Sequence, residues 1–179
     1  MSAPGRNWKL DLIERHRDLF QPPADMPEAA QGAPDTGPGW QDLLDRLCGR
    51  IRSAVRADGG TFKFSQIKQK YATLRVYWHG NLSQEAAAQV EEAIDLAEAR
   101  SACTCEICGE PGSLHGTGWF TTRCEKHAEG RKPIPSQPSD DMQVIQRVVG
   151  GRRRMLHRRY DSATDAFVDV DLTPPPEKE

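Results

Sequence analysis

The sequence CTCEICG over residues 103–109, followed by CEKH over residues 124–127, decides how the middle of this chain folds. It contains two pairs of metal-binding side chains, each with two residues between its members, and fifteen residues separate the pairs. Each short loop can present two ligands to one ion while the intervening stretch folds back as a hairpin, as in tetrahedral zinc sites. The spacing therefore predicts one zinc ion with four protein ligands: Cys105, Cys108, Cys124 and His127.

Neighbouring residues refine this prediction. Cys103 lies outside the two-residue spacing, so we expect it to be a spare thiol, and Gly109 stands where a tight loop needs a positive φ angle. Four protein ligands close the coordination shell and leave no place for a catalytic water, so the zinc is predicted to be structural. The alternative is a set of unlinked reduced cysteines near a surface histidine.

The sequence on the N-terminal side of this motif predicts a helix, a β-hairpin and a second helix. Apolar residues from Trp40 to Val55 follow a helical period, and two glycines then end the helix. Residues 61–67 and 74–79 are rich in aromatic and β-branched side chains, as in paired strands. Asn81 or Ser83 can cap the following amphipathic helix. We predict an α+β fold: a helix–β-hairpin–helix core, then a zinc ribbon or treble clef, and a small C-terminal β addition.

Composition divides the chain further. A helix is predicted before Pro22, with Trp8, Leu12, Leu19 and Phe20 on one side, and the proline- and glycine-rich stretch after it is predicted to lack fixed structure. The predicted parts are an N-terminal helix at 1–20, a linker at 21–39, an α+β domain at 40–128 whose zinc knuckle spans 103–128, a linker at 129–140, a basic β-hairpin region at 141–172 and a disordered tail at 173–179.

Charge is uneven along the chain although the formal net charge is only −2. Residues 41–80 and 131–160 are basic, whereas residues 81–104 and 161–179 are acidic. Two positive surfaces are therefore expected, and each is a candidate for binding nucleic-acid phosphates. The candidates on the first hairpin are Lys63, Lys68, Lys70 and Arg75, and those near the C-terminus are Arg147, Arg152, Arg153, Arg154, Arg158 and Arg159.

Each basic group has an alternative role. Alternate residues of a strand point to opposite faces, so Arg152, Arg154 and Arg158 can form one row for phosphates. Acidic residues on the adjacent C-terminal strand can instead balance these arginines. On the first hairpin, aromatic side chains lie between the basic ones and can stack on bases, but at least half of them are expected to be needed in the core.

The central stretch resembles a known group of proteins. The matching residues are Gly39-Trp40, the segment QIKQKY over 66–71, LRVY over 74–77 and CEICG over 105–109. They are similar to small zinc-knuckle proteins of bacterial, phage and prophage genomes that have no assigned activity. The resemblance covers about residues 39–128 and implies a zinc-bearing domain without implying an activity.

We expect a non-enzymatic, zinc-stabilised, phage-linked binding protein that engages nucleic acid or a nucleic-acid-handling complex. The N-terminal segment lacks the apolar core of a signal peptide, and no stretch is apolar enough to span a bilayer, so a cytoplasmic location is expected, without membrane contact and without a small-molecule substrate. One alternative is a protein-interaction module that docks its first helix on a host enzyme and inhibits or regulates it. A reduced HNH-type nuclease is a third interpretation, which His115 weakens because it has no second histidine beside it.

Overall fold

The computed structural model describes residues 7–137, 142–149 and 151–170, and for residues 147–149 it describes only the backbone. It is a mixed α+β structure, which confirms the predicted class. The chain divides into two compact units between Pro135 and Ser136, and each unit is described by itself. Among the described residues, the helices are too short or too polar to cross a membrane.

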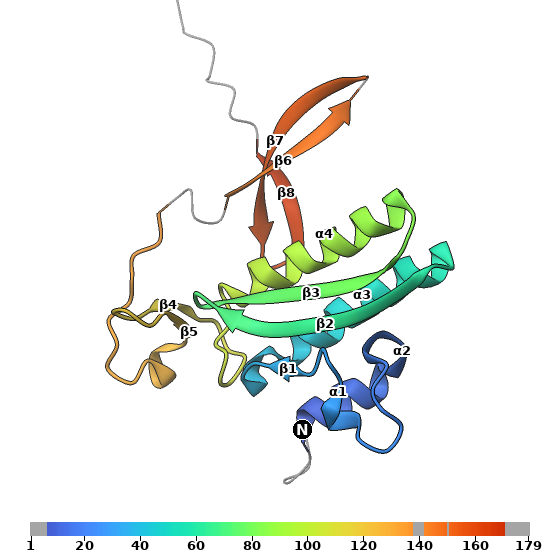
Figure 1. Cartoon of the computed structure of the whole chain (residues 1–179). Helices are drawn as coiled ribbons and strands as arrows, with labels where there is room; N and C mark the ends of the chain where they lie inside the picture. The colour runs from blue at the N-terminus through green and yellow to red at the C-terminus, as the bar shows by residue number, and fades with distance from the viewer. Residues whose placement is uncertain (1–6, 138–141, 150, 171–179) are drawn as a thin grey trace, which may run out of the picture. The chain divides into compact units, whose positions relative to one another are not determined.

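The first unit holds all the described helices and two sheets (Figure 1). Its α-helices are α1 (Trp8–Arg15), α2 (Arg17–Phe20), α3 (Gln41–Asp58) and α4 (Gln84–Ser101). Its 3-10 turns are η1 (Pro27–Ala29), η2 (Pro38–Trp40) and η3 (Glu125–His127). Its strands are β1 (Pro34–Asp35), β2 (Thr61–Lys70), β3 (Thr73–Asn81), β4 (Ser113–His115) and β5 (Thr121–Arg123).

The predicted β-hairpin is present as the antiparallel pair of β2 and β3, and a bulge in β2 sets which side chains face the core. Phe62 and Phe64 are buried, and the register then shifts between Phe64 and Gln66. The extra residue, Ser65, moves the inward positions by one, so that Ile67 is also buried. The bulge therefore keeps the apolar side chains on one face of the sheet and the lysines on the other.

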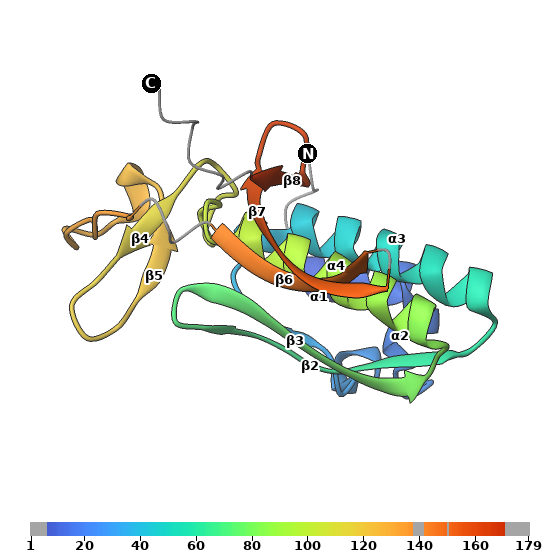
Figure 2. The same cartoon turned by 90° about the horizontal axis from the view of Figure 1, so that it is seen from above.

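A single core joins the helices to that apolar face. Figures 1 and 2 show α3 and α4 lying along one side of the sheet, while the described helices of this unit leave the other side uncovered. Trp40, Leu44 and Ile51 of the α3 region and Val90 of α4 are fully buried in this cluster. Both helices were predicted from their apolar period, and the stripe that defined them is the surface they bury.

The prediction that an N-terminal helix at 1–20 forms a part of its own is wrong for the described residues 7–20. Leu12, Ile13, Leu19 and Phe20 belong to the same buried cluster as α3 and the sheet, and the ring centroids of Phe20 and Phe64 lie 4.9 Å apart. Their helical spacing gives them a common face, and that face packs inside the unit. It is therefore not available as a docking face for a host enzyme.

The prediction that residues 21–39 lack fixed structure is also wrong. Pro34 and Asp35 form the short strand β1, which pairs in parallel with β2 at Ile67 and Lys68. The Gln21 side chain donates a hydrogen bond from Nε2 to the carbonyl oxygen of Phe62 at 2.9 Å. The prolines begin short turns here, and contacts with distant residues give the stretch its order.

The second unit contains a three-stranded antiparallel sheet, which agrees with the expected β addition. Its strands are β6 (Met142–Val149), β7 (Arg152–Asp161) and β8 (Ala166–Val170), in the order β6-β7-β8. The turn between β7 and β8 is closed by the pairing of Asp161 with Ala166. The predicted linker at 129–140 is described only as far as residue 137, and the predicted tail at 173–179 lies outside the described residues.

We predict that Phe20→Ala destabilises the first unit by about 3–5 kcal/mol, because it removes a fully buried ring that packs on Phe64. Chemical denaturation followed by circular dichroism measures the change. Met26→Ala is the control, since that side chain is 55 % exposed and its loss is expected to cost under about 0.5 kcal/mol. Equal stability of the two variants would contradict the placement of α2 in the core.

Candidate metal centre

The four predicted ligands come together at one point. The Sγ atom of Cys105 lies 3.7 Å from Nδ1 of His127, and the Sγ atoms of Cys108 and Cys124 are also 3.7 Å apart. Nδ1 of His127 lies 3.2 Å from Sγ of Cys124, and all four ligand atoms lie within 4.8 Å of one another. A tetrahedron with metal–sulfur bonds of about 2.3 Å has edges of roughly 3.7 Å. The cluster therefore could hold a metal ion in tetrahedral geometry.

Short backbone motifs aim the ligands. The loop that carries Cys105 and Cys108 closes with a 2.8 Å hydrogen bond from the N–H of Gly109 to the carbonyl oxygen of Cys105, and Gly109 has a φ of +81°. This is the left-handed conformation expected from the sequence. The single turn η3 places His127 beside Cys124, whose carbonyl oxygen accepts the His127 N–H at 3.0 Å. Cys103 lies outside the ligand cluster, as predicted.

The first ligand loop is attached to the start of α3. The N–H of Gly39 donates to the carbonyl oxygen of Glu106 at 2.8 Å, and Nε1 of the buried Trp40 donates to the carbonyl oxygen of Thr104 at 2.9 Å. A side chain at position 39 would collide with the carbonyl oxygen of Cys105. Glycine is therefore needed there so that two backbone segments can approach closely.

Glu106 links three parts of this region. One carboxylate oxygen accepts the N–H of Gly37 at 3.0 Å, and the other pairs with Arg123 of β5 at 3.0 Å. Both charged side chains are nearly buried, with 11 % and 13 % of their surface exposed. Removal of either partner would leave a charge in a poorly solvated place. Sequence reasoning missed Glu106. Two features of the sequence could have pointed to it: Glu106 lies between Cys105 and Cys108, and an arginine of opposite charge, Arg123, directly precedes Cys124.

The thiol of Cys105 ionises more readily than an ordinary cysteine thiol, because its pKa is lowered. Burial opposes the charged form, but backbone N–H groups of Cys124, Cys108 and Ile107 stabilise it and lower the pKa of the Cys105 thiol to about 6. Cys105 is fully buried, whereas Cys108 is exposed. The candidate metal site therefore lies at the edge of the unit, with one of its four side chains facing solvent.

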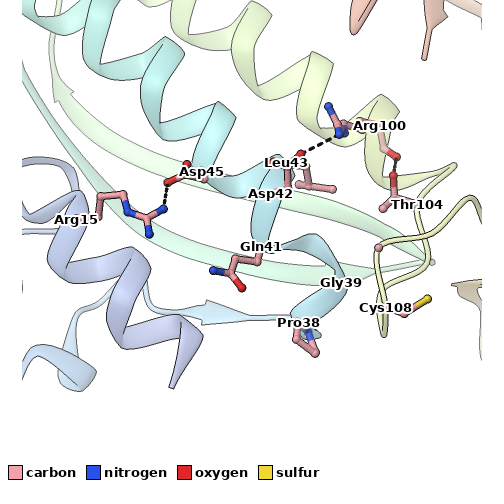
Figure 3. Close-up of a pocket in the computed structure, with 11 residues that line it drawn as sticks. Arg15, Pro38, Gly39, Gln41, Asp42, Leu43, Asp45, Arg100, Thr104 and Cys108 are labelled. Atoms are coloured by element: carbon pink, nitrogen blue, oxygen red, sulfur yellow. Dashed lines mark hydrogen bonds and ion pairs between the residues drawn. The ribbon is translucent and has the colours of Figure 1, made fainter. Parts of the chain in front are cut away.

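A cavity of about 420 Å³ adjoins the metal centre at Cys108 (Figure 3). Its charged side chains already pair with one another, Arg15 with Asp45 at 2.8 Å and Arg100 with Asp42 at 2.9 Å. These pairs lie on the cavity wall, so they offer a ligand little unmatched charge. The cavity gives no preference for a class of small molecule.

The predicted basic residues of the first hairpin share one side of the sheet. The strand register places these basic residues on the side of the sheet opposite the core, which we call the open face. The open face is formed by Lys63, Gln66, Lys68, Lys70, Arg75, Tyr77 and His79. Lys70 is exposed, Lys63 and Lys68 are half-buried, and Arg75 approaches Glu98 of α4 at 3.5 Å. Phe62 and Phe64 are buried while Tyr71 and Tyr77 are exposed, so the open face keeps aromatic rings beside its cations.

The arginines of the second unit do not form the predicted row. Arg158 is only 2 % exposed, because its guanidinium stacks on Phe167 at 3.8 Å from the ring centroid and bonds to Gln143. Arg158 is therefore excluded as a surface contact for phosphate. The side chain of Arg147 lies outside what the structure describes. The other four predicted residues are exposed: Arg152, Arg153, Arg154 and Arg159.

The acidic residues beside these arginines have other contacts. Asp161 accepts hydrogen bonds from the N–H of Ala163 and from Thr164, which lower the pKa of its carboxyl, and Asp165 accepts the hydroxyl of Tyr160 at 2.7 Å. Both carboxylates thus stabilise the turn between β7 and β8. On β8 itself, Asp169 lies opposite Arg158 in the register of the two strands.

Comparison with known proteins adds no identification. The chain has no significant match to a family model, to a curated protein or to a solved structure.

We predict that Cys124→Ser abolishes stoichiometric metal binding and lowers the melting temperature by roughly 10 °C or more, because a metal in a closed site contributes its binding free energy to folding. Elemental analysis and thermal melting measure both effects. Cys103→Ser is the matched control, since Cys103 is a half-buried cysteine outside the cluster. Loss of metal in both variants would contradict the ligand assignment.

We predict that Gly39→Ala lowers stability by about 1–3 kcal/mol and weakens metal retention, because the added methyl group displaces the loop that carries Cys105. Gly49→Ala is the control: position 49 lies in α3 with open space around it, so alanine is expected to raise stability by roughly 0.5–1 kcal/mol. Denaturation curves with and without chelator measure both. If Gly39→Ala behaved like Gly49→Ala, the loop would not depend on this close approach.

Proposed function

We propose that this chain is a non-enzymatic, zinc-stabilised protein that binds nucleic acid, or a complex that handles it, through the open face of the β2–β3 hairpin. The observation that carries the proposal is the charge of that hairpin. Residues 61–81 contain three lysines and one arginine, and no aspartate or glutamate. A sheet face with charge of one sign and exposed rings suits a polyanion with flat bases.

The donor set supports zinc as the metal. Three thiolates and one imidazole suit zinc, whereas magnesium and calcium prefer oxygen ligands. Four protein ligands leave no open coordination position, so a bound zinc ion would supply folding energy and would not activate water. Its ligands would then hold β5 near the hairpin, where the Thr122 hydroxyl donates to the carbonyl oxygen of Ala72 at 2.7 Å.

The geometry gives less support to the rival functions. The apolar face of α1 and α2, which a protein-interaction module would use, is buried in the core. The lone histidine His115, which a nuclease would need as a base or ligand, is 6 % exposed, and its Nδ1 lies 2.9 Å from the carbonyl oxygen of Ser113. Nucleic-acid binding through the open face needs neither group.

We predict that the triple variant Lys63→Gln, Lys68→Gln, Lys70→Gln binds labelled DNA more weakly and with a weaker salt dependence. Each lost phosphate contact reduces the slope of log affinity against log salt by about 0.7–0.9, so the triple variant should lose roughly 2–3 units of slope. Fluorescence anisotropy from about 50 mM to about 200 mM salt measures this slope.

The control removes the same charge from another element. The control variant carries three substitutions on α3, which packs on the covered side of the sheet: Arg46→Gln, Arg50→Gln and Arg56→Gln. This variant should keep the slope of the unmodified chain. The proposed function is wrong if the unmodified chain fails to bind at low salt, or if the two triple variants lose slope equally.

A further inference from the structure

Three large aromatic side chains remain in solvent around two turns of the first unit, and a fourth, Tyr77, lies further along β3 on the open face. Tyr71 is 69 % exposed and Trp119 is 71 % exposed, while Tyr77 and Phe120 are 47 % and 37 % exposed. Aromatic rings stabilise a core more than most side chains do, so a tryptophan left in solvent loses the large favourable free energy of its burial. Together these four residues form what we call the ring surface.

Hydrogen bonds join the two turns of the ring surface, although these turns are distant in sequence. Tyr71 lies in the β2–β3 turn, and Trp119 and Phe120 lie in the loop between β4 and β5; Figures 1 and 2 both show the two side by side. Nε2 of Gln69 donates to the carbonyl oxygen of Phe120 at 3.1 Å. The Thr122 hydroxyl bonds to the carbonyl oxygen of Ala72, so both sides of the contact are fixed.

The turn that carries Tyr71 is costly for its residues. Lys70 pairs with Thr73, so the connection has two residues, and both have positive φ angles of 52° and 70°. Such turns favour asparagine and glycine, because side chains are strained in the left-handed region. Ala72 is fully buried and fills space, but the Tyr71 ring does not contribute to the core. Folding alone therefore does not explain a tyrosine at this position, and strain of this kind clusters at functional sites.

Charge complementarity selects the partner. Residues 111–124, like the hairpin, contain no aspartate or glutamate. Cations lie beside the rings: Nζ of Lys70 is 5.2 Å from the Tyr71 ring centroid, and Nζ of Lys68 is 5.7 Å from that of Tyr77. Each cation is therefore placed to contact a phosphate next to a ring that can stack on a base. A duplex hides the faces of its bases, and an apolar protein would leave the lysines unmatched.

We infer that the ring surface binds single-stranded nucleic acid by stacking bases on Trp119 and Tyr71, with phosphates on the neighbouring lysines. The inference rests on the proposed function and names its substrate class. DNA and RNA share the stacking and phosphate chemistry, so the test includes both. Bases stack on rings in any sequence, so little sequence preference is expected.

The test uses the full zinc-loaded chain and labelled single strands of about 12 nucleotides, as DNA and as RNA, with a DNA duplex of the same sequence for comparison. Trp119→Ala should weaken single-strand binding about tenfold or more and should change duplex binding by less than about twofold. Trp119→Phe retains a ring and should restore most of the affinity. Met26→Ala removes an exposed apolar side chain from another part of the unit and should change neither.

A second variant separates stability from binding. Tyr71→Asn places a residue that favours the turn, so it should raise the melting temperature while it weakens single-strand binding. If Trp119→Ala and Tyr71→Asn both keep full single-strand affinity while the lysine triple variant loses it, the stacking inference is wrong and the proposed function stands. If no nucleic acid binds the unmodified chain, both are wrong.

Discussion

The close contact between the start of α3 and the first ligand loop is the constraint on which the first unit depends. Gly39 brings its backbone against Cys105 and Glu106, and Trp40 reaches from the same turn to Thr104. A metal held by the four ligands would fasten this loop to η3 and β5. The helical layer, the ligand loops and the hairpin would then be linked by a few short-range contacts.

This arrangement connects the candidate metal site to the open face. Thr122 of β5 and the carbonyl oxygen of Ala72 join the ligand region to the hairpin turn, and Arg123 pairs with the carboxylate of Glu106 between the ligands Cys105 and Cys108. The bulge at Ser65 assigns the aromatic and aliphatic residues of β2 to the core and its lysines to the open face. The candidate metal site, the core and the open face are thus connected through named contacts.

The sequence predicted the regular elements and the ligands, because both have local signatures. The period of apolar residues located α3 and α4, and the spacing of the cysteines selected Cys105 over Cys103. Order in residues 21–39 could not be predicted, because its partners are far away in the chain, such as Ile67 for Pro34. The segments around Gly39 and Cys105 are also distant in the chain, whereas the structure places them in contact.

Exposure of single side chains was the other limit. Strand periodicity gives a face but does not say whether that face is covered, so the burial of Arg158 beneath Phe167 and the exposure of Trp119 had no signature in the sequence. The aromatic residues of the hairpin divided as strand alternation requires, with Phe64 of β2 inside and Tyr77 of β3 outside. Whether a given side chain is buried depends on which other elements pack against its face, and a single sequence does not show this.

X-ray absorption at the zinc edge of the purified full chain tests the central claim most directly. The account predicts one zinc per chain with three sulfur neighbours at about 2.3 Å and one nitrogen neighbour at about 2.0 Å. A first shell that contains oxygen in place of a sulfur, or a chain that folds with no zinc bound, would contradict it.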